Sequence, residues 1–511
     1  MIVRSYVGGS PVDGAAGSFD STNPAQLDDV VATVQLASAD QLVGAFRTAK
    51  AAQPAWAATP APVRGRVIAQ IGRLVEANAE ALAQLVVREV GKPLAEARGE
   101  VQEIVDTCDF FLGEGRRLYG QTVPSEMRDK QLFTFRVPVG VAGIITAGNF
   151  PVAVPSWYLV PALLCGNAVV WKPADYSAAL GDALTRLFVA GGLPAGVLNT
   201  VHADGPTTFD GLTQALEHGL VQKVGFTGSS EVGVRIGELC GRHLQSPCLE
   251  LGGKNPMVVM PDADLDLAAE GALFAGFGTA GQRCTSLGLV VVHESVHDAF
   301  LDKLLARLAE ATVGDPREAV LYGPMLSERF LAGWEKWLGE IQPHHTVHGP
   351  TGRITRDNPR EGFVGDPDAG VYAHPVVVSG VRPEDALYRN ETFGPLVPVL
   401  PFASFDEAVE LANGHGYGLS AAIYTADARA VWDFRSRVSA GMLSVNNSTS
   451  GAEAHLPFGG NGKSGNGSRQ SGMWVLDQFT RWQSMNWDYA GKLQKAQMDV
   501  EESTADLGFR L

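Results

Sequence analysis

One cysteine of this sequence lies in a setting that suits a reactive thiol. Cys284 follows the segment 278–283, whose residues are small, polar or cationic, and it precedes Thr285. A structural cysteine normally lies in an apolar run, because its side chain behaves as a small hydrophobe. The adjacent Arg283 would favour the thiolate, which is the nucleophilic form. The segment indicates a covalent nucleophile, and it leaves a structural cysteine open as the alternative.

A glutamate in an apolar setting is the candidate general base. Glu250 lies between two leucines, and two glycines, Lys254 and a predicted strand follow it. Burial would raise the pKa of its carboxyl, which suits proton transfer near neutral pH. The alternative is a structural ion pair between Glu250 and Lys254, and the motif does not decide between the two.

A polar residue also follows the end of a predicted strand. The apolar run 139–146 leads into a Gly-Asn-Phe-Pro turn that contains Asn149. Ligands bind beyond the carboxyl ends of parallel strands, and the Asn149 amide could donate a hydrogen bond to a developing oxyanion. Taken alone, the turn favours an ordinary structural asparagine.

Two other strand ends offer groups for a dinucleotide. The segment 226–233 reads as a strand, a turn at Gly228-Ser229 and a helix start, which would present free backbone N–H groups to a phosphate. The spacing is not the usual G-x-G-x-x-G, so a generic dinucleotide match is weak. Lys172 and Asp175 close another strand, within reach of a ribose or phosphate. A solvated charge pair is the alternative for these two.

The hydrophobic pattern predicts the elements that position these residues. The first third reads as helices, and from residue 139 short apolar runs alternate with helical stretches. The expected strands are 139–146, 168–171, 198–202, 224–227, 256–260 and 289–293, and a helix is expected over 265–277. This alternation implies βαβ units and mainly parallel sheets.

Length, composition and charge exclude several classes of protein. The 511 residues suggest about three domains at roughly 150 residues each. A net charge of −16 lacks the basic footprint of a nucleic-acid-binding protein. The five cysteines are few and irregularly spaced, which indicates a reducing compartment, and no apolar signal core opens the chain. We therefore expect a cytoplasmic protein without a nucleic-acid partner.

Two patterns suggest other sites superficially. The run 150–171 is apolar enough to span a membrane, but prolines interrupt it, so a buried helix followed by a buried strand is expected and no membrane partner. Two groups resemble metal ligands: His344, His345 and His348, and Cys240, His243 and Cys248. Neither has a second matching ligand pair, so no metal is expected.

Together the segments resemble the aldehyde dehydrogenase superfamily over nearly the whole chain. Its motifs occur here in order: Asn149-Phe150-Pro151, Lys172-Pro173, Phe226 to Ser229, Leu249 to Lys254, Gly281 to Cys284, Glu391 to Pro395 and Pro457 to Gly460. The separation of 34 residues between Glu250 and Cys284 also fits. The order of so many motifs argues against chance.

The resemblance implies an NAD(P)-dependent, non-acylating enzyme with Cys284 as nucleophile and Glu250 as the base for deacylation. Asn149 and the backbone N–H of Cys284 would form the oxyanion hole. The residues implied to bind the cofactor, NAD with NADP as the alternative, are Thr146, Ala147, Lys172, Asp175, Gly228, Ser229, Gly233, Leu251, Glu391 and Phe393. In that set, Lys172 and Asp175 hold the adenosine ribose, Gly228-Ser229 face the pyrophosphate, and Glu391 and Phe393 place the nicotinamide ribose.

A closer resemblance is to the antiquitin branch, which oxidises α-aminoadipic semialdehyde. The segments that carry it are 149–154, 165–172, 278–285 and 449–453. It implies that the substrate is bound by Phe150, Arg283, Thr285, Gly451 and Ala452. A buried Arg283 requires an anion, so a carboxylate-bearing semialdehyde is expected. The alternatives are a protein carboxylate as the partner of Arg283, and a general aliphatic or aromatic aldehyde as substrate.

Three departures from the family pattern bear on specificity. Gly148 stands where many relatives carry a bulky residue, which predicts a wider entrance. Asp175 replaces the commoner glutamate; its negative charge predicts NAD over NADP, by a modest margin. The segment 461–470 follows the antiquitin branch only loosely, so the exact substrate is not predicted.

The resemblance also implies the architecture. A Rossmann-type parallel-sheet cofactor domain would comprise residues 1–118 and 138–250, and an α/β catalytic domain residues 251–458. A small β arm of residues 119–137 and 470–495 would form a homodimer or homotetramer. An acylating dehydrogenase generally lacks the base that Glu250 supplies, and an alcohol dehydrogenase needs a metal or a Tyr-Lys pair. The set of Cys284, Glu250 and Asn149 argues against a non-catalytic relative.

Overall fold

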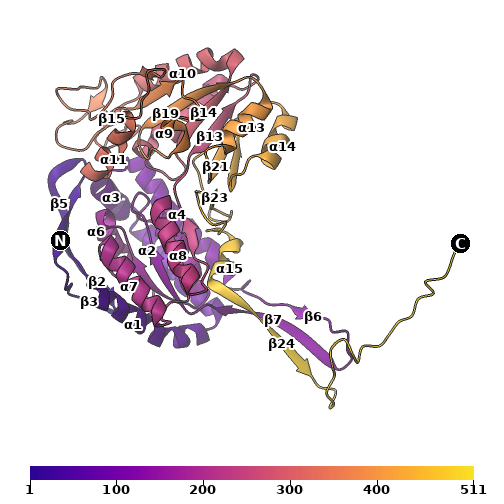
Figure 1. Cartoon of the computed structure of the whole chain (residues 1–511). Helices are drawn as coiled ribbons and strands as arrows, with labels where there is room; N and C mark the ends of the chain where they lie inside the picture. Colours follow the sequence, from indigo (N-terminus) through magenta and orange to yellow (C-terminus); the bar gives the residue numbers. More distant parts are fainter.

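The computed structural model describes residues 1–511, which form two α/β lobes and a projecting β arm (Figure 1). Each lobe is built on one seven-stranded sheet. The chain passes from the first sheet to the second between Glu250 and Asn255, and it returns to the first lobe after the last strand of the second sheet. The predicted α/β class with mainly parallel sheets is confirmed.

The first sheet has the strand order β12-β11-β8-β9-β10-β2-β3. The bounds are β12 Cys248–Glu250, β11 Lys223–Thr227, β8 Val141–Ile145, β9 Ala168–Lys172, β10 Leu198–Thr200, β2 Ser5–Val7 and β3 Ser10–Val12. The strands from β12 to β10 are parallel, and β2 and β3 are antiparallel. The chain runs from β8 out to β10 and then returns to β11, on the other side of β8. Open α/β sheets bind ligands at such a reversal of strand order.

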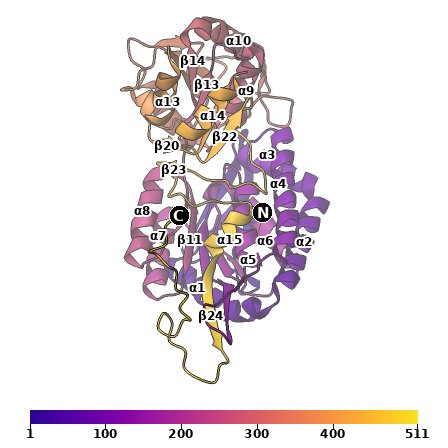
Figure 2. The same cartoon turned by 90° about the vertical axis from the view of Figure 1, so that its right-hand side faces the viewer.

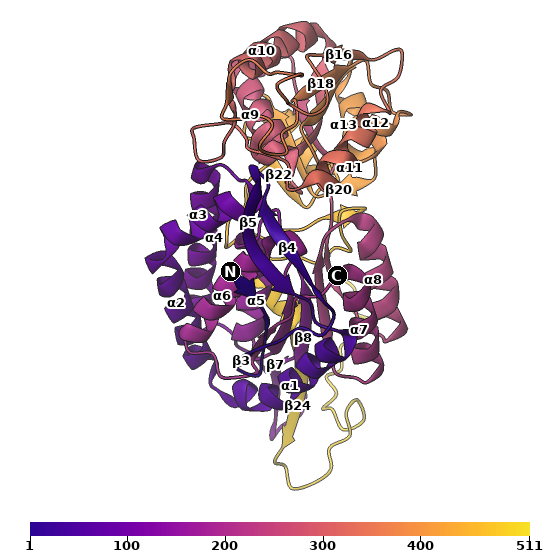
Figure 3. The same ribbon diagram turned by 90° about the vertical axis from the view of Figure 1, so that its left-hand side faces the viewer.

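Both faces of this sheet are covered, because successive residues of each strand enter different cores. In β9, Val170 packs with α1 (Ala39–Ala58), α7 (Gly205–Glu217) and α8 (Ser230–Arg242). Its neighbours Val169 and Trp171 pack with the helices of the opposite face. These are α2 (Ala61–Ala77), α3 (Ala79–Val90), α4 (Leu94–Glu114), α5 (Ala153–Leu164) and α6 (Ala178–Ala190). Figure 3 shows the two helical layers on opposite sides of the lobe.

The second sheet has the strand order β16-β18-β19-β14-β13-β21-β22. The bounds are β16 Thr346–His348, β18 Val376–Ser379, β19 Leu396–Phe402, β14 Leu287–His293, β13 Asn255–Val259, β21 Ser420–Tyr424 and β22 Met442–Val445. All neighbours are parallel except β16. The helices packed on it include α9 (Leu265–Phe277), α10 (His297–Glu310), α11 (Glu328–Leu338), α13 (Phe405–Asn413) and α14 (Ala428–Arg437).

The arm is a three-stranded antiparallel sheet of β24 (Thr480–Asp488), β7 (Lys130–Pro138) and β6 (Thr122–Val123). It projects away from both lobes (Figure 2). After its first residue, every residue of β24 is exposed, including Trp482, Met485 and Trp487. The arm therefore presents large apolar side chains to its surroundings.

The prediction that the first third of the chain is helical is wrong for residues 2–35, which form strands. Residues 2–35 contain β1 (Ile2–Val3), β2, β3, β4 (Ser18–Asn23) and β5 (Gln26–Gln35). Their pairing depends on partners distant in sequence, such as β2 on β10, which local periodicity does not show. The other expected strands lie within two or three residues of the observed ones, and α9 has the predicted bounds.

The apolar run 150–171 forms the predicted helix and strand, α5 followed by β9. Every residue of α5 is buried in the core. None of the helices combines the length and the apolar character needed to cross a membrane.

Candidate active site

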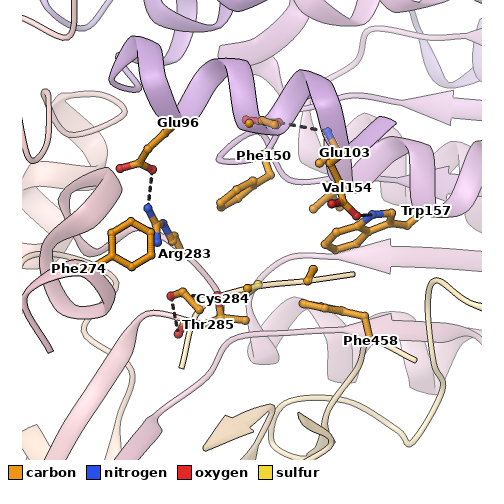
Figure 4. Close-up of a pocket in the computed structure, with 16 residues that line it drawn as sticks. Glu96, Glu103, Phe150, Val154, Trp157, Phe274, Arg283, Cys284, Thr285 and Phe458 are labelled. Carbon is orange, nitrogen blue, oxygen red and sulfur yellow. Dashed lines mark hydrogen bonds and ion pairs between the residues drawn. The ribbon is translucent and has the colours of Figure 1, made fainter. Parts of the chain in front are cut away.

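Cys284 lies where loops of the two lobes meet, at the wall of a cavity of about 320 Å³ (Figure 4). The loop before it is strained: φ is 52° at Thr279 and Ala280 and 68° at Gly281. A Cβ on Gly281 would lie 2.3 Å from the carbonyl oxygen of Gly394, so only glycine fits there. Side chains rarely adopt this left-handed conformation, and such strain is concentrated at functional sites.

The hydrogen-bond donors predicted for an oxyanion hole lie at this loop. The backbone N–H of Cys284 has no protein acceptor, while its carbonyl accepts from Asn255 Nδ2 at 2.8 Å. Asn149 is buried, and its Nδ2 donates to the carbonyl of Gln282 at 2.8 Å, two residues before the cysteine. That is the only hydrogen bond of the Asn149 amide group, so its second N–H is free to bind a ligand.

The expectation that Arg283 activates the thiol is wrong. Burial, together with the negative charges of Glu250 and Glu391, raises the pKa of the Cys284 thiol to about 12. The Arg283 guanidinium pairs with the carboxylate of Glu96, which neutralises its charge. The thiol therefore needs a base to become nucleophilic.

Glu250 is the buried base candidate, and the alternative of an ion pair with Lys254 is excluded. Glu250 ends β12, and neither of its carboxylate oxygens has a hydrogen-bond partner. Nζ of Lys254 is also buried without a partner. Burial raises the pKa of the Glu250 carboxyl well above its ordinary value; the charge of Arg469 and the N–H of Gly460 oppose this rise and do not cancel it.

The predicted cofactor residues converge at one edge of the first sheet. Thr146 and Ala147 follow β8, Lys172 ends β9, Gly228 and Ser229 follow β11, and Leu251 follows β12. The Ser229 side chain caps α8, whose first backbone N–H groups face this edge. These groups fit an anionic phosphate. Gly233 is needed for packing instead, because a Cβ there would lie 2.4 Å from Cδ2 of Leu251.

Lys172 and Asp175 form a salt bridge of 2.6 Å beside this edge. The expected wider entrance at Gly148 is wrong. A Cβ on Gly148 would lie 2.7 Å from both the Tyr176 ring and Ser177 Oγ, so Tyr176 fills the space that a side chain would take. The Tyr176 hydroxyl also accepts a hydrogen bond from the Gly148 N–H at 3.2 Å.

Glu391 and Phe393 lie near the nucleophile on the side of the second lobe. The Glu391 carboxylate accepts a hydrogen bond from the Gly253 N–H at 3.0 Å, and burial raises its pKa to about 7. Phe393 has a φ of 43° and its ring packs 5.9 Å from that of Phe330. Phe330 also packs edge-on to Tyr176, so an aromatic cluster joins the two lobes here.

The premise that Arg283 needs an anion from the substrate is wrong. The alternative, a protein carboxylate as the partner of Arg283, is borne out. Its Nη2 lies 2.5 Å from a carboxylate oxygen of Glu96, and its Nε donates to Thr279 Oγ1 at 3.2 Å. Its guanidinium carbon lies 4.5 Å from the centre of the Phe274 ring. The pair closes the strained loop onto α4, and Arg283 still lines the cavity.

The late loop is fastened beside the nucleophile. Thr449 Oγ1 donates to the carbonyl of Thr285 at 2.9 Å, and Ser450 Oγ donates to the same carbonyl at 3.2 Å. Gly451 and Ala452 line the cavity with Phe150 and Thr285, and their backbone N–H groups have no protein acceptor. The structure thus places all five predicted substrate residues around one cavity.

Sequence reasoning missed most of the cavity wall. Glu96, Glu100 and Glu103 lie on one face of α4 and all border the cavity. Residues spaced by four and three positions lie on one face of a helix, and apolar residues share this face. The sequence therefore did contain a signal that the three glutamates face the same way. Trp157 and Phe458 complete the wall and gave no signal, because aromatic residues in apolar runs are ordinary core residues.

His344 and His345 meet Asp385 in the second lobe. Both Nε2 atoms lie within 3.0 Å of one Asp385 oxygen. Nδ1 of His345 accepts the N–H of Gln342 at 3.0 Å, so its proton is on Nε2. A histidine that binds a metal through Nε2 normally carries its proton on Nδ1 and donates it to a second partner. Because Nδ1 of His345 accepts a hydrogen bond instead, the arrangement argues against a metal here.

Comparisons with known proteins agree with this geometry. A family model described as "Aldehyde dehydrogenase family" matches residues 12–485. The chain is 34% identical to "Alpha-ketoglutaric semialdehyde dehydrogenase" of Bacillus subtilis (strain 168), covering 93% of this chain and 96% of the relative. It is also 34% identical to "Aldehyde dehydrogenase family 7 member A1" of Malus domestica, covering 94% and 93%.

Solved structures are similar over the same length. Betaine aldehyde dehydrogenase of Staphylococcus aureus, in complex with NAD+, has a TM-score of 0.90 at 28% identity and covers 96% of each chain. A 3,6-anhydro-L-galactose dehydrogenase in complex with the NADP ligand has a TM-score of 0.88 at 31% identity, covering 95% of this chain and all of that one (100%).

Proposed function

The chain belongs to the aldehyde dehydrogenase family and is an NAD(P)-using oxidoreductase, and we propose that its reaction runs through a thioester on Cys284 that Glu250 resolves. One observation supports this assignment most strongly. A buried carboxylate without hydrogen-bond or ion-pair partner lies close enough to the Cys284 thiol to raise its pKa. Burying such a group costs stability, and carboxyl groups with pKa values perturbed in this way are concentrated at functional sites.

Cys284 and Glu250 act as a coupled pair in this proposal. The pKa values of the Cys284 thiol and of the Glu250 carboxyl are both raised, so a second negative charge in this site is unfavourable. Transfer of the thiol proton to Glu250 moves one charge without adding another, so it avoids the cost of burying two anions. The transfer gives a thiolate beside a protonated carboxyl.

The thiolate adds to the aldehyde carbon and produces a tetrahedral oxyanion. The Cys284 N–H and the free N–H of Asn149 stabilise the charge where it develops. Collapse of this adduct expels hydride and leaves a thioester on Cys284. NAD(P)+ supplies the hydride acceptor when it is bound.

The dinucleotide would be held at the carboxyl edge of the first sheet. Its pyrophosphate fits the N-terminus of α8 at Gly228-Ser229, and Lys172 and Asp175 would hold the adenosine ribose. Thr146, Ala147, Leu251, Glu391 and Phe393 complete the proposed site. On this basis residues 1–118 and 138–250 form the cofactor domain and residues 251–458 the catalytic domain.

Hydrolysis of the thioester completes the reaction. After hydride transfer, Glu250 releases the proton of the thiol to solvent. It then takes a proton from water, whose oxygen adds to the thioester carbon and displaces the Cys284 sulfur as a thiolate, and this thiolate recovers the proton from Glu250. The products are the carboxylic acid, the reduced cofactor and one proton. An acylating enzyme that passes the thioester to another acceptor would not need this base.

For the substrate we propose a carboxylate-bearing semialdehyde, with α-aminoadipic semialdehyde as the first to test. The curated relatives that are 34% identical include a semialdehyde dehydrogenase and a family 7 member A1 protein. Since Glu96 neutralises Arg283, the free N–H groups of Gly451 and Ala452 are the better ligands for the carboxylate.

The exposed arm supports a further part of the proposal, a homodimer or homotetramer. Trp482 and Trp487 of β24 are 53% and 56% exposed, which is unusual for such large apolar side chains. Light scattering tests this assignment, and a monomer at micromolar concentration would contradict it.

Absorbance of the reduced cofactor tests the proposed function as a whole. The protein is incubated with NAD+ and a panel of aldehydes that includes α-aminoadipic semialdehyde. We expect cofactor reduction that Cys284→Ala abolishes. Reduction that persists in Cys284→Ala would overturn the assignment of the nucleophile.

A further inference from the structure

One helix of the first lobe holds both loops that carry the proposed oxyanion donors. Glu96 and Glu100 lie four residues apart, on the same face of α4. Glu96 accepts hydrogen bonds from the N–H and the hydroxyl of Thr279, and it pairs with Arg283, the residue before Cys284. Figure 4 shows the Glu96–Arg283 pair between α4 and this loop. The loop that carries the nucleophile is therefore tied to the first turn of α4.

Glu100, one turn further along α4, holds the turn that contains Asn149. Its Oε1 accepts the N–H groups of Val152 and Ala153 at 2.8 and 3.2 Å. These N–H groups begin α5, which has no side-chain cap of its own. Pro151 fixes one backbone dihedral of the short link between Asn149 and the capped residues. The position of Asn149 therefore depends on a carboxylate that comes from another helix.

Lys92 completes this cap from the loop before α4. It forms an ion pair with Oε2 of Glu100, and both side chains are buried, with exposed fractions of 1% and 0%. Nζ of Lys92 also lies 3.5 Å from the centre of the Phe150 ring, so it contacts the residue that follows Asn149. Glu100 borders the cavity, but the protein engages both of its carboxylate oxygens. The pair thus faces the Asn149 turn and not a ligand.

We infer that Lys92 and Glu100 are positioning residues of the oxyanion hole, which hold the Asn149 amide where it and the Cys284 N–H can donate to the same oxygen. The Asn149 amide makes one hydrogen bond, to the carbonyl of Gln282, and this bond does not fix the backbone that carries the side chain. Donors that are in place before the charge develops stabilise it most. The inference rests on the proposed function, because it assigns the residues that keep that site in shape.

Paired variants test the inference without leaving a buried charge unpaired. Lys92→Met/Glu100→Ala removes both charges and the cap, whereas Lys92→Met/Glu100→Gln keeps an oxygen that can accept the N–H groups of α5. We expect the Ala variant to slow cofactor reduction in a single turnover by about tenfold or more, which is part of the loss expected for a missing oxyanion donor. The Gln variant should recover most of the rate. Equal rates in the two variants would overturn the inference.

The Michaelis constants distinguish positioning from substrate binding. Because the protein engages the carboxylate of Glu100, the Ala variant should lose the same factor in rate for aldehydes of different shape, with little change in KM. A loss confined to KM for particular aldehydes would show that Glu100 binds the substrate, and it would overturn the inference.

Glu89 provides a matched control, because it is a buried carboxyl that caps α6 in the same way. It accepts the N–H groups of Ala179 and Leu180, both at 2.8 Å, and it does not line the cavity. Glu89→Ala should lower the Tm and keep the single-turnover rate at saturating cofactor, whereas Lys92→Met/Glu100→Ala should lower both. An equal loss of rate in Glu89→Ala would overturn the inference, since the loss of any helix cap would then be sufficient.

A mutant cycle with Asn149 shows whether the pair acts through that residue. Asn149→Ala already removes the amide, so adding Lys92→Met/Glu100→Ala to it should cause little further loss of rate. Losses that multiply would overturn the inference, because the pair would then affect the rate independently of Asn149.

Hydrogen exchange of the resting protein separates this inference from the proposed function. The amides of Val152 and Ala153 should exchange faster in Lys92→Met/Glu100→Ala than in the wild type, and Lys92→Met/Glu100→Gln should restore their protection. Unchanged protection in the Ala variant would overturn this inference alone and leave aldehyde oxidation standing. Faster exchange together with a full rate in Asn149→Ala would overturn both, since Asn149 would then stabilise no oxyanion.

Discussion

Glu250 and Lys254 are four residues apart, both are buried, and they do not pair with each other. The segment between them carries the chain from one lobe to the other. An ion pair would have made Glu250 a structural residue. Its absence leaves a carboxyl with a strongly raised pKa beside the thiol, which is the arrangement that a general base requires.

Stability should respond to the ionisation of Glu250. The folded-state pKa of this carboxyl lies above the unfolded value of about 4.5, so between the two values the folded state binds the extra proton and stability falls as pH rises. Glu250→Gln should match the wild type below pH about 4.5 and become more stable above it, by about 1.4 kcal/mol for each pH unit up to the folded pKa. Thermal unfolding across pH checks this, and a difference independent of pH would contradict it.

Asn149→Ala should lower kcat by about 10²–10³-fold, because it removes one oxyanion donor. The fold should be retained, since the Asn149 amide makes one hydrogen bond, to the Gln282 carbonyl. Steady-state kinetics, with circular dichroism as the control for folding, tests the role. A loss of less than about threefold would show that Asn149 is a structural turn residue.

Arg283 should support the loop and not select the substrate. Arg283→Gln leaves Glu96 without its partner, and removing one member of a buried ion pair costs about 3–5 kcal/mol. The double variant with Glu96→Gln should lose less than the sum of the two single variants. Denaturant unfolding measures these losses.

A kinetic test of the same prediction for Arg283 compares two aldehydes of similar length. Arg283→Gln should reduce kcat/KM by similar factors for α-aminoadipic semialdehyde and for a plain aldehyde. A loss confined to the semialdehyde would show that Arg283 binds the substrate carboxylate despite its pairing with Glu96.

Asp175 should favour NAD+ over NADP+. Its carboxylate can accept a ribose hydroxyl and would repel a 2′-phosphate, while Lys172, 2.6 Å away, moderates the effect. The ratio of kcat/KM for NAD+ to kcat/KM for NADP+ should be smaller in Asp175→Asn than in the wild type. A wild type that prefers NADP+ would show that the carboxylate does not control the choice.

The fold and the chemistry differed in how far the sequence could predict them. Parallel strands such as β9 were visible because apolar residues fill both faces of a buried sheet. Strands β1 to β5 were not, because their partners are distant in sequence. Cys284, Glu250 and Asn149 could be proposed from motifs, and the structure brings them to one loop junction.

The side-chain partners could not be predicted, because they come from elements that the sequence does not bring together. Glu96 reaches Arg283 from α4, across 187 residues of chain. Tyr176 fills the space beside Gly148 from a different strand end. The glutamates of α4 have a helical spacing, but only the packed structure shows which groups each of them binds.

Mass spectrometry of Glu250→Gln after mixing with NAD+ and an aldehyde substrate tests the central claim most directly. Glutamine preserves the shape of the side chain and cannot take a proton from water, so the thioester should accumulate on Cys284. The predicted result is the reduction of one cofactor per active site, more slowly than in the wild type because glutamine cannot take the thiol proton either. A mass increase equal to the acyl group should appear on the peptide that contains Cys284, followed by still slower turnover. Undiminished steady-state turnover without any trapped adduct would contradict the account.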